Sequence, residues 1–161
     1  MTTKSLVSAF IIPTVTAVLV LGSHVTVSYA GSKKIVGSWK NHVTPTTPGP
    51  GVPPPFDTFI SFTREGIVLD SSPSPLVNPG HGVWFNTGRR QFKATFFLLQ
   101  FDEQFQLVGP AKVRATLEVN EVGDRYSGES RTEIFDATGK TVLQSFDALM
   151  EGRRILLDPL P

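Results

Sequence analysis

Between Ala111 and Val119 the sequence alternates strictly between apolar and polar side chains. The odd-numbered positions carry Ala, Val or Leu, and the even-numbered positions carry Lys, Arg, Thr or Glu. Successive side chains of a β-strand point to opposite faces of a sheet, so this period of two predicts a strand with one apolar face. Such a strand belongs in an antiparallel sheet that covers a core on one side and meets water on the other.

Similar short runs, rich in Val, Ile, Phe and Thr and bounded by Gly, Pro, Asp or Asn, recur along the chain, whereas helical periodicity is nearly absent. The further predicted strands are Lys34–Thr44, Asp57–Thr63, Ile67–Asp70, Gly82–Asn86, Gln91–Phe101, Arg125–Phe135, Thr141–Met150 and Arg153–Leu157. Several connectors have hairpin length and turn-forming residues. Consecutive strands joined by hairpins form a meander, and a meander of this size commonly closes so that no edge stays exposed. The sequence therefore predicts an all-β fold, an antiparallel up-and-down β-barrel of about eight strands.

Two stretches interrupt the strand pattern, Pro45–Pro55 and Ser71–Pro79. Proline has no N–H to give to a sheet and favours extended backbone without hydrogen bonds. We therefore predict two long loops, the first crossing or flanking an open end of the barrel. A linker between domains is disfavoured, because only one short strand would precede it.

Residues 1–30 have the features of a cleavable signal peptide. Lys4 supplies a positive charge, an apolar run spans Leu6–Leu21, and Ser28 and Ala30 are the small residues that a signal peptidase needs. The run contains Pro13 and several hydroxyl residues, whereas a spanning helix needs about 20 strongly apolar residues. We therefore expect cleavage after Ala30, a secreted or periplasmic protein with no stable membrane span, and a single barrel domain over residues 31–161.

The composition argues against several classes of function. The 15 basic and 14 acidic residues become equal in number once Lys4 leaves, and the signs are interspersed, so we expect no nucleic-acid partner. There is no cysteine, which excludes disulfides, thiol catalysis and thiolate metal sites. The two histidines of the mature chain, His42 and His81, lack metal-ligand spacing. No nucleophile elbow, phosphate loop or acid–base pair is present, so we expect no metal and no cofactor and assign no catalytic residue.

The segment from Asn78 to Trp84 is the first candidate site. A histidine between two glycines, His81, is free to present its ring, and we expect Trp84 to share its face if the strand starts at His81. The pair would then form a pocket mouth with an aromatic floor. The alternative is a turn followed by a strand whose Trp fills the barrel, with His81 at the surface.

The strand from Tyr126 to Ile134 is the second candidate. Its outward positions carry charged residues, so Tyr126, Ser130 and Thr132 face inward, where a solid core would use larger aliphatic residues. Small polar residues facing inward are typical of a barrel with a cavity. Gln144 on the next strand adds an amide to this layer. The alternative is that these hydroxyls satisfy one another across the sheet.

The strand Gln91–Phe101 is apolar on both faces in its middle. Its outward residues, Phe97 and Leu99, are therefore either covered by a proline-rich loop or form a homodimer patch.

Gly37-Ser38-Trp39, on the first strand, resembles the G-x-W signature of lipocalins and the wider calycin superfamily. In that group the Trp packs at the closed barrel end, often beneath an Arg from the last strand, and the resemblance implies this role for Arg153 or Arg154. The second lipocalin triplet is not evident, and the proline-rich insert departs from the pattern. The chain also resembles uncharacterised secreted bacterial proteins with a G-H-G-V-W segment. By architecture alone it is similar to allene oxide cyclase-like barrels, which steer cyclisation of apolar substrates without a cofactor.

The function we expect is binding of a small apolar or amphipathic molecule outside the cytoplasm, with affinity from desolvation of roughly 25 cal/mol per Å² of apolar surface. The expected ligand-binding residues are His81, Trp84, Tyr126, Ser130, Thr132 and Gln144. Two alternatives stay open. One is a cofactor-independent isomerase or cyclase in which His81 or Tyr126 moves a proton. The other is a structural or interaction module with a solid barrel and a binding face at Phe97–Leu99.

Overall fold

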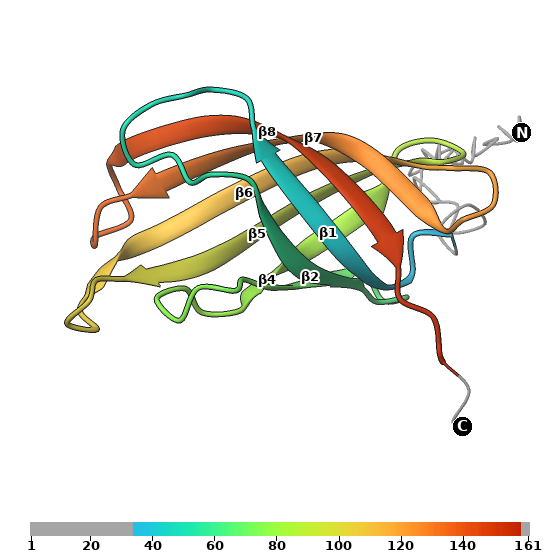
Figure 1. Cartoon of the computed structure of the whole chain (residues 1–161), viewed down its shortest axis with the longest axis horizontal. Helices are drawn as coiled ribbons and strands as arrows, with labels where there is room; N and C mark the ends of the chain where they lie inside the picture. The colour runs from blue at the N-terminus through green and yellow to red at the C-terminus, as the bar shows by residue number, and fades with distance from the viewer. Residues whose placement is uncertain (1–33, 159–161) are drawn as a thin grey trace, which may run out of the picture.

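A computed structural model describes residues 34–158, and eight antiparallel strands account for most of this range (Figure 1). The strands are β1 (Gly37–Pro45), β2 (Phe56–Phe62), β3 (Ile67–Ser71), β4 (Gly80–Asn86), β5 (Gln91–Phe101), β6 (Leu107–Val119), β7 (Arg125–Phe135) and β8 (Val142–Arg154). Each strand pairs with the next, and β8 pairs with β1, so the sheet closes into an up-and-down barrel. The predicted all-β barrel is confirmed. The predicted signal peptide and its cleavage site lie outside the described residues.

Within residues 34–158, no helix is long and apolar enough to cross a membrane.

Apart from the last strand, most strands were predicted with ends that differ by a few residues, the largest difference being at β6, which begins at Leu107 and not at Ala111. Gln91–Phe101 and Arg125–Phe135 are confirmed, but the separate strand Arg153–Leu157 is wrong, because β8 continues without a break to Arg154. Gly152 is a buried position inside that strand, where an added Cβ would lie 2.0 Å from Cε1 of Tyr126. This glycine therefore gives the Tyr126 ring its space and does not mark a turn.

One end of the barrel is filled by aromatic and aliphatic side chains. Trp39 and Tyr126 pack edge to face with ring centroids 5.1 Å apart, and Phe62 contacts both Tyr126 and Trp84 in the same manner. Ile35, Trp39, Phe62 and Phe92 are almost fully buried there. Edge-to-face aromatic pairs add about 0.5–1.5 kcal/mol each to the burial of their area. This packed cluster forms the closed end of the barrel.

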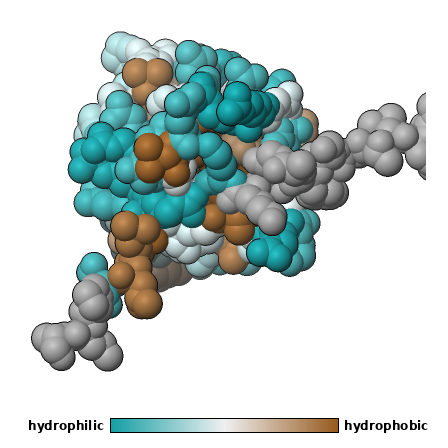
Figure 2. Space-filling model, turned by 90° about the vertical axis from the view of Figure 1, so that its right-hand side faces the viewer, coloured by the Kyte–Doolittle hydropathy of each residue, from teal (hydrophilic) through white to brown (hydrophobic). Residues whose placement is uncertain are grey.

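Arg154 covers Trp39 at the closed end. Its guanidinium carbon lies 4.2 Å from the centroid of the Trp39 ring. The guanidinium also donates hydrogen bonds to the carbonyl oxygens of Lys34, Val36 (2.7 Å) and Gly123 (2.6 Å). Of the two arginines that the lipocalin resemblance offered, the structure assigns this position to Arg154, while Arg153 is exposed. Where the described residues are visible, the surface of this end is mostly hydrophilic, with separate hydrophobic side chains (Figure 2).

No loop within the described part of the chain covers the outward residues of β5. Phe97 is 47% exposed and Leu99 40% exposed. The second proline-rich stretch does run beside the end of this strand, where Asn78 N donates to Leu99 O at 3.0 Å, but it leaves both side chains accessible. The ammonium of Lys112 lies 5.6 Å from the centroid of the Phe97 ring. A homodimer through this face stays a prediction.

Candidate functional site

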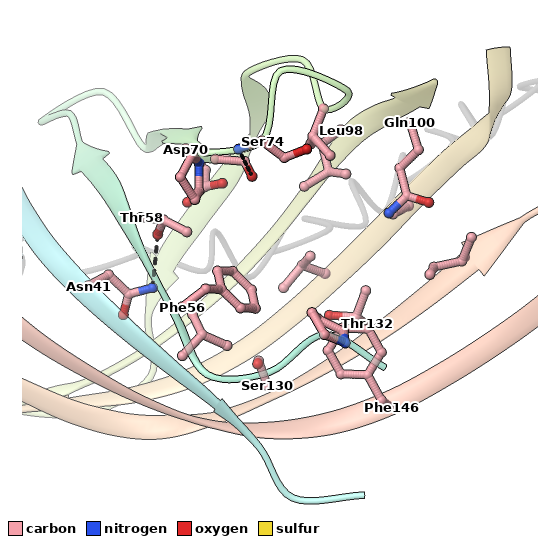
Figure 3. Close-up of a pocket in the computed structure, with 18 of the residues that line it drawn as sticks. Asn41, Phe56, Thr58, Asp70, Ser74, Leu98, Gln100, Ser130, Thr132 and Phe146 are labelled. Carbon is pink, nitrogen blue, oxygen red and sulfur yellow. Dashed lines mark hydrogen bonds between the residues drawn. The ribbon is translucent and has the colours of Figure 1, made fainter. Parts of the chain in front are cut away.

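The end of the barrel opposite Trp39 contains a cavity of about 360 Å³ (Figure 3). Its walls come from the inward faces of the strands and from the two proline-rich stretches, of which Gly51, Pro53 and Pro54 belong to the first and Ser72, Pro73, Ser74 and Val77 to the second. The prediction that the first loop flanks one end of the barrel is therefore confirmed. The barrel interior is filled with aromatic rings at the closed end and is hollow at this end. Small inward side chains such as Ala111 and Ser130 line the hollow part.

Most of the cavity wall is apolar. The larger apolar side chains that line it are Val43, Phe56, Phe96, Leu98, Val113, Ile134, Phe146 and Met150. They come from β1, β2, β5, β6, β7 and β8, so apolar surface faces the cavity from nearly every side of the barrel. A wall of this kind favours the apolar part of a ligand through the hydrophobic effect.

Polar groups gather on one part of the wall, where β1, β2 and β3 run side by side (Figure 3). Asn41, on β1, donates from Nδ2 to Thr58 Oγ1 on β2 at 3.1 Å. Thr58 in turn lies beside Asp70 on β3, where its hydroxyl favours the ionised form of the carboxyl group. Below them, the Tyr126 hydroxyl donates to Asn41 Oδ1 at 2.7 Å. Three side chains from three strands, Tyr126, Asn41 and Thr58, therefore form one hydrogen-bonded chain that ends beside Asp70.

Asp70, beside this chain, is the chemically distinctive residue of the polar wall. It is 6% exposed, and it is the one ionisable side chain among the described residues that line the cavity. Burial raises the pKa of its carboxyl group to about 6, an effect that the neighbouring Thr58 hydroxyl partly opposes. Burial, and then the nearby charge of Asp70, raise the pKa of the Tyr126 hydroxyl. Tyr126 therefore stays a neutral hydrogen-bond donor at physiological pH.

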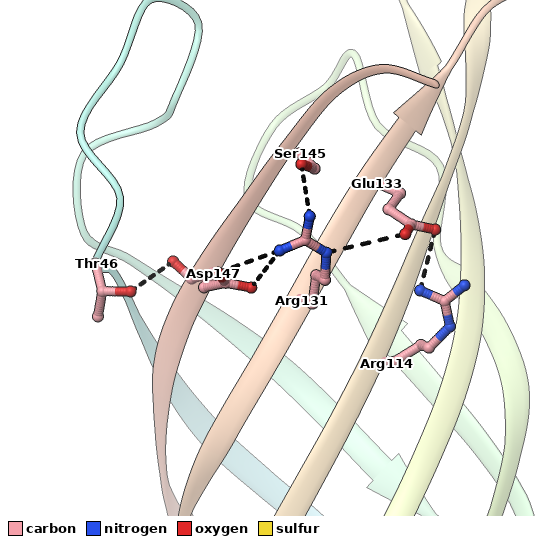
Figure 4. Close-up of polar contacts among 6 residues, drawn as sticks. All are labelled: Thr46, Arg114, Arg131, Glu133, Ser145 and Asp147. Atoms are coloured by element: carbon pink, nitrogen blue, oxygen red, sulfur yellow. Dashed lines mark hydrogen bonds and ion pairs between the residues drawn. The ribbon is translucent and has the colours of Figure 1, made fainter. Parts of the chain in front are cut away.

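The first proline-rich loop is fixed to β8 at the edge of the cavity. Gln144 Nε2 donates to Pro50 O at 2.9 Å. At the start of the loop, Thr46 Oγ1 donates to Asp147 O at 3.1 Å, and the Asp147 carboxylate is held by Arg131 at 3.1 Å (Figure 4). The Asp147–Arg131 pair belongs to a charged network on the outer face of β6, β7 and β8, in which Arg114 also pairs with Glu133 at 3.0 Å (Figure 4). The loop therefore has a defined position over the hollow end of the barrel.

The structure brings some of the predicted site residues together and separates others. Ser130 and Thr132 line the cavity, and the inward face predicted for their strand is confirmed. Tyr126 lies one layer below, in the packed cluster, and reaches the cavity only through Asn41. Gln144 lies at the edge and contacts the loop. The ligand-binding role of these residues stays a prediction.

His81 and Trp84 do not form the predicted pocket mouth. The expectation that they share a face is wrong, because residues three positions apart on a strand point to opposite faces. His81 is exposed on the outside of the barrel, and Trp84 is buried in the closed end, with its indole N–H donating to Thr63 O at 3.0 Å. Neither side chain lines the cavity. The alternative, in which the Trp fills the barrel and His81 lies at the surface, describes the structure.

Sequence reasoning missed the polar wall of Asn41, Thr58 and Asp70. A signal for Asp70 was present, since Val68 and Asp70 share one face of their strand and Ile67 and Leu69 the other. Ile67 and Leu69 are apolar as well, so the sequence of this strand does not distinguish the two faces, and both side chains are partly exposed on the outside. Within residues 34–158, no group of three His, Asp or Glu side chains is arranged to hold a metal ion.

No protein-family model matches this chain, and no curated protein matches it in sequence. The fold and the site together define the class: a closed eight-stranded antiparallel β-barrel, packed at one end and hollow at the other.

Proposed function

We propose that the protein binds a small apolar or amphipathic molecule in the hollow end of its barrel. The observation that carries this proposal is the cavity of about 360 Å³ with its largely apolar wall. Ligand pockets in proteins typically measure about 300–1,000 Å³, and they combine apolar walls with a few polar groups that set the orientation. This cavity is at the lower end of that range, which favours a small ligand.

The two sides of the cavity have different roles in this proposal. The apolar side chains remove the ligand from water, and each Å² of apolar surface buried contributes roughly 25 cal/mol. The hydroxyls of Ser130 and Thr132 and the polar wall at Asp70 orient the polar part of the ligand. A solid barrel acting only as an interaction module is disfavoured by the presence of the cavity.

We also infer that the protein is a lipocalin-like member of the calycin superfamily that acts after export from the cytoplasm. The supporting observations are the eight-stranded up-and-down barrel, the Gly37-Ser38-Trp39 segment on β1 and the Arg154 guanidinium over the Trp39 ring. Export rests on the signal-peptide features of residues 1–30.

A cofactor-independent isomerase or cyclase is the second candidate, and Asp70 is the observation that favours it. A carboxyl group with a raised pKa in an apolar cavity suits general acid–base catalysis near neutral pH. The proton-moving residue in this candidate is then Asp70, because His81 faces outward and Tyr126 is committed to Asn41. Conversion of a bound molecule, and not binding alone, distinguishes this candidate.

Replacing Thr132 by phenylalanine tests the binding proposal. The larger ring would fill the cavity, so we expect the affinity for the neutral dye N-phenyl-1-naphthylamine to fall by at least about tenfold, which corresponds to about 1.4 kcal/mol. Equilibrium fluorescence titration measures this affinity, and circular dichroism checks that the variant is folded.

The matched control is Thr116→Phe, the same substitution on the outer face of the neighbouring strand β6. We expect this variant to bind the dye as the unchanged protein does. Equal binding by folded Thr132→Phe and Thr116→Phe would place the dye outside the cavity and contradict the proposal.

A further inference from the structure

Within residues 34–158, the carboxyl group of Asp70 has no cationic partner. Among the described residues that line the cavity there is no Lys, Arg or His. Burying a carboxylate is costly unless it is paired with a cation or well supplied with hydrogen bonds. Here the neighbouring Thr58 hydroxyl is the side-chain group that favours the carboxylate form.

The charged groups on the surrounding strands all lie on the other side of the sheet. On β1, Lys40 and His42 point outward and pair with Asp57 of β2 at 3.0 and 2.7 Å. On β4, His81 is exposed, and Gly80 and Gly82 flank it. Inside the barrel, the other titratable group near Asp70 is Tyr126, which is neutral. No residue of the range 34–158 supplies a cation to this carboxyl group, so a ligand is the source that the cavity offers.

The hydrogen bonds beside Asp70 run in one direction. The Tyr126 hydroxyl donates to Asn41 Oδ1, and Asn41 Nδ2 donates to Thr58 Oγ1. Thr58 accepts from Asn41, so its own hydroxyl proton remains available to the Asp70 carboxyl group beside it. No charged donor among the described residues that line the cavity faces this carboxyl group, so it can accept hydrogen bonds from a ligand.

We propose that the ligand is an organic cation, a protonated amine with an apolar body, whose ammonium group pairs with the Asp70 carboxylate. This inference rests on the proposed function and adds the chemical class of the ligand. An ammonium group has three N–H donors. Ser72 and Ser74 line the cavity after the end of β3, and their hydroxyl oxygens, which already accept from Ser74 N and Leu76 N, each have a second lone pair for a donor, while the apolar wall takes the rest of the molecule.

The strand opposite Asp70 leaves the carboxyl group accessible from the cavity. Gly80 faces Asp70 in the β3–β4 register, and an added Cβ there would lie 3.2 Å from Asp70 Cβ and 3.0 Å from the Phe96 ring. A larger residue at this position would press on the Asp70 side chain at its Cβ and on the Phe96 ring. The glycine therefore preserves the place where the ammonium group and the apolar body of the ligand meet.

The test compares three ligands that share one alkyl chain and differ in the head group: octylamine, 1-octanol and octanoate. Isothermal titration at pH 8 measures their binding to protein produced from the full-length chain. We expect octylamine to bind about tenfold or more tightly than 1-octanol, because charge-assisted hydrogen bonds are roughly twice as strong as neutral ones. Octanoate should bind most weakly, because two carboxylates repel each other.

The pH dependence and two variants complete the test. Lowering the pH from 8 to 5 protonates Asp70, whose pKa is about 6, and should weaken octylamine binding by about tenfold while leaving 1-octanol binding unchanged. Asp70→Asn should abolish the preference for the amine, whereas Asp57→Asn, which removes the same charge on the outer face, should preserve it.

Each result decides between distinct conclusions. Equal affinity for octylamine and 1-octanol in the unchanged protein would overturn the cation inference and leave the binding proposal intact. Absence of binding by all three ligands would overturn the proposed function itself. Because the comparison of ligands and of pH uses the unchanged protein, it remains decisive even if Asp70→Asn does not fold.

Discussion

Replacing Arg154 with alanine is expected to lower the free energy of unfolding by about 3 kcal/mol, since hydrogen bonds from charged groups contribute about 1.5–3 kcal/mol and a cation–π contact adds about 0.5–2 kcal/mol. The side chain donates to three backbone carbonyls, those of Lys34, Val36 and Gly123, and covers the Trp39 ring. These carbonyls belong to the segment before β1 and to the β6–β7 turn, so a single residue of β8 connects three parts of the closed end.

Urea unfolding followed by Trp fluorescence measures this effect. Arg153→Ala is the matched control, because Arg153 is the exposed neighbour on the same strand, and surface substitutions usually change stability by about 0.5 kcal/mol or less. Arg154→Lys should recover only part of the loss, because an ammonium group cannot reproduce the planar fork of the guanidinium. Equal stability of the Arg154→Ala and Arg153→Ala proteins would contradict the role assigned to Arg154.

Replacing Asp70 with asparagine is expected to raise the free energy of unfolding at pH 7.5 by about 2 kcal/mol. The folded-state pKa of Asp70 is about 6, above the value of 3.8 for an exposed carboxyl group. The folded protein therefore holds this proton more tightly than the unfolded chain, and the associated stability is present below about pH 4 and is lost as the pH rises through 6. Asparagine remains neutral and does not incur this loss.

The measurement is the difference in unfolding free energy between the variant and the unchanged protein at several pH values. The gain should be near zero at pH 4, grow between pH 4 and 6, and be constant above pH 7. Asp57→Asn provides the control, since the Asp57 carboxylate is exposed and its pKa is lowered by hydrogen bonds from His42 and Lys40. A gain that does not depend on pH, or a loss of stability at pH 7.5, would contradict the description of Asp70 as a buried carboxyl group that lacks a cationic partner.

A stabilising substitution in the cavity has a consequence for function. Residues kept at a cost to stability are commonly those that a binding or catalytic site requires. If Asp70→Asn stabilises the fold and also removes the preference for an amine, the same carboxyl group accounts for both effects. No second residue would then be needed to explain the change in stability and the loss of the preference for an amine.

The strands of the barrel could be predicted because their signal is local. Alternation between Ala111 and Val119 and between Tyr126 and Ile134 identifies both the strand and its inward face, and the inward hydroxyls of Ser130 and Thr132 indicated a hollow layer that the structure contains. The end of the last strand was harder to predict from the sequence. Gly152 and the two arginines after it resemble a turn, and only the distance to the Tyr126 ring explains why a glycine stands inside a strand.

The polar wall could not be predicted because it depends on neighbours far apart in the sequence. Asn41, Thr58 and Tyr126 are brought together by the pairing of β1 with β2 and by closure of the barrel through β8, and no local pattern encodes these contacts. Asp70 lies in a short strand whose apolar residues face both sides. For such a strand, the choice of inward face follows from the register with β2 and β4 and not from its own sequence.

The central claim is that the hollow end of this barrel holds a small molecule. The most direct measurement is a native mass spectrum of protein exported from its own full-length gene and exposed to the lipids of its host, recorded before and after extraction with organic solvent. The account predicts a discrete additional mass that extraction removes and that is absent from the Thr132→Phe variant. The mass of the bare chain under every condition would contradict it.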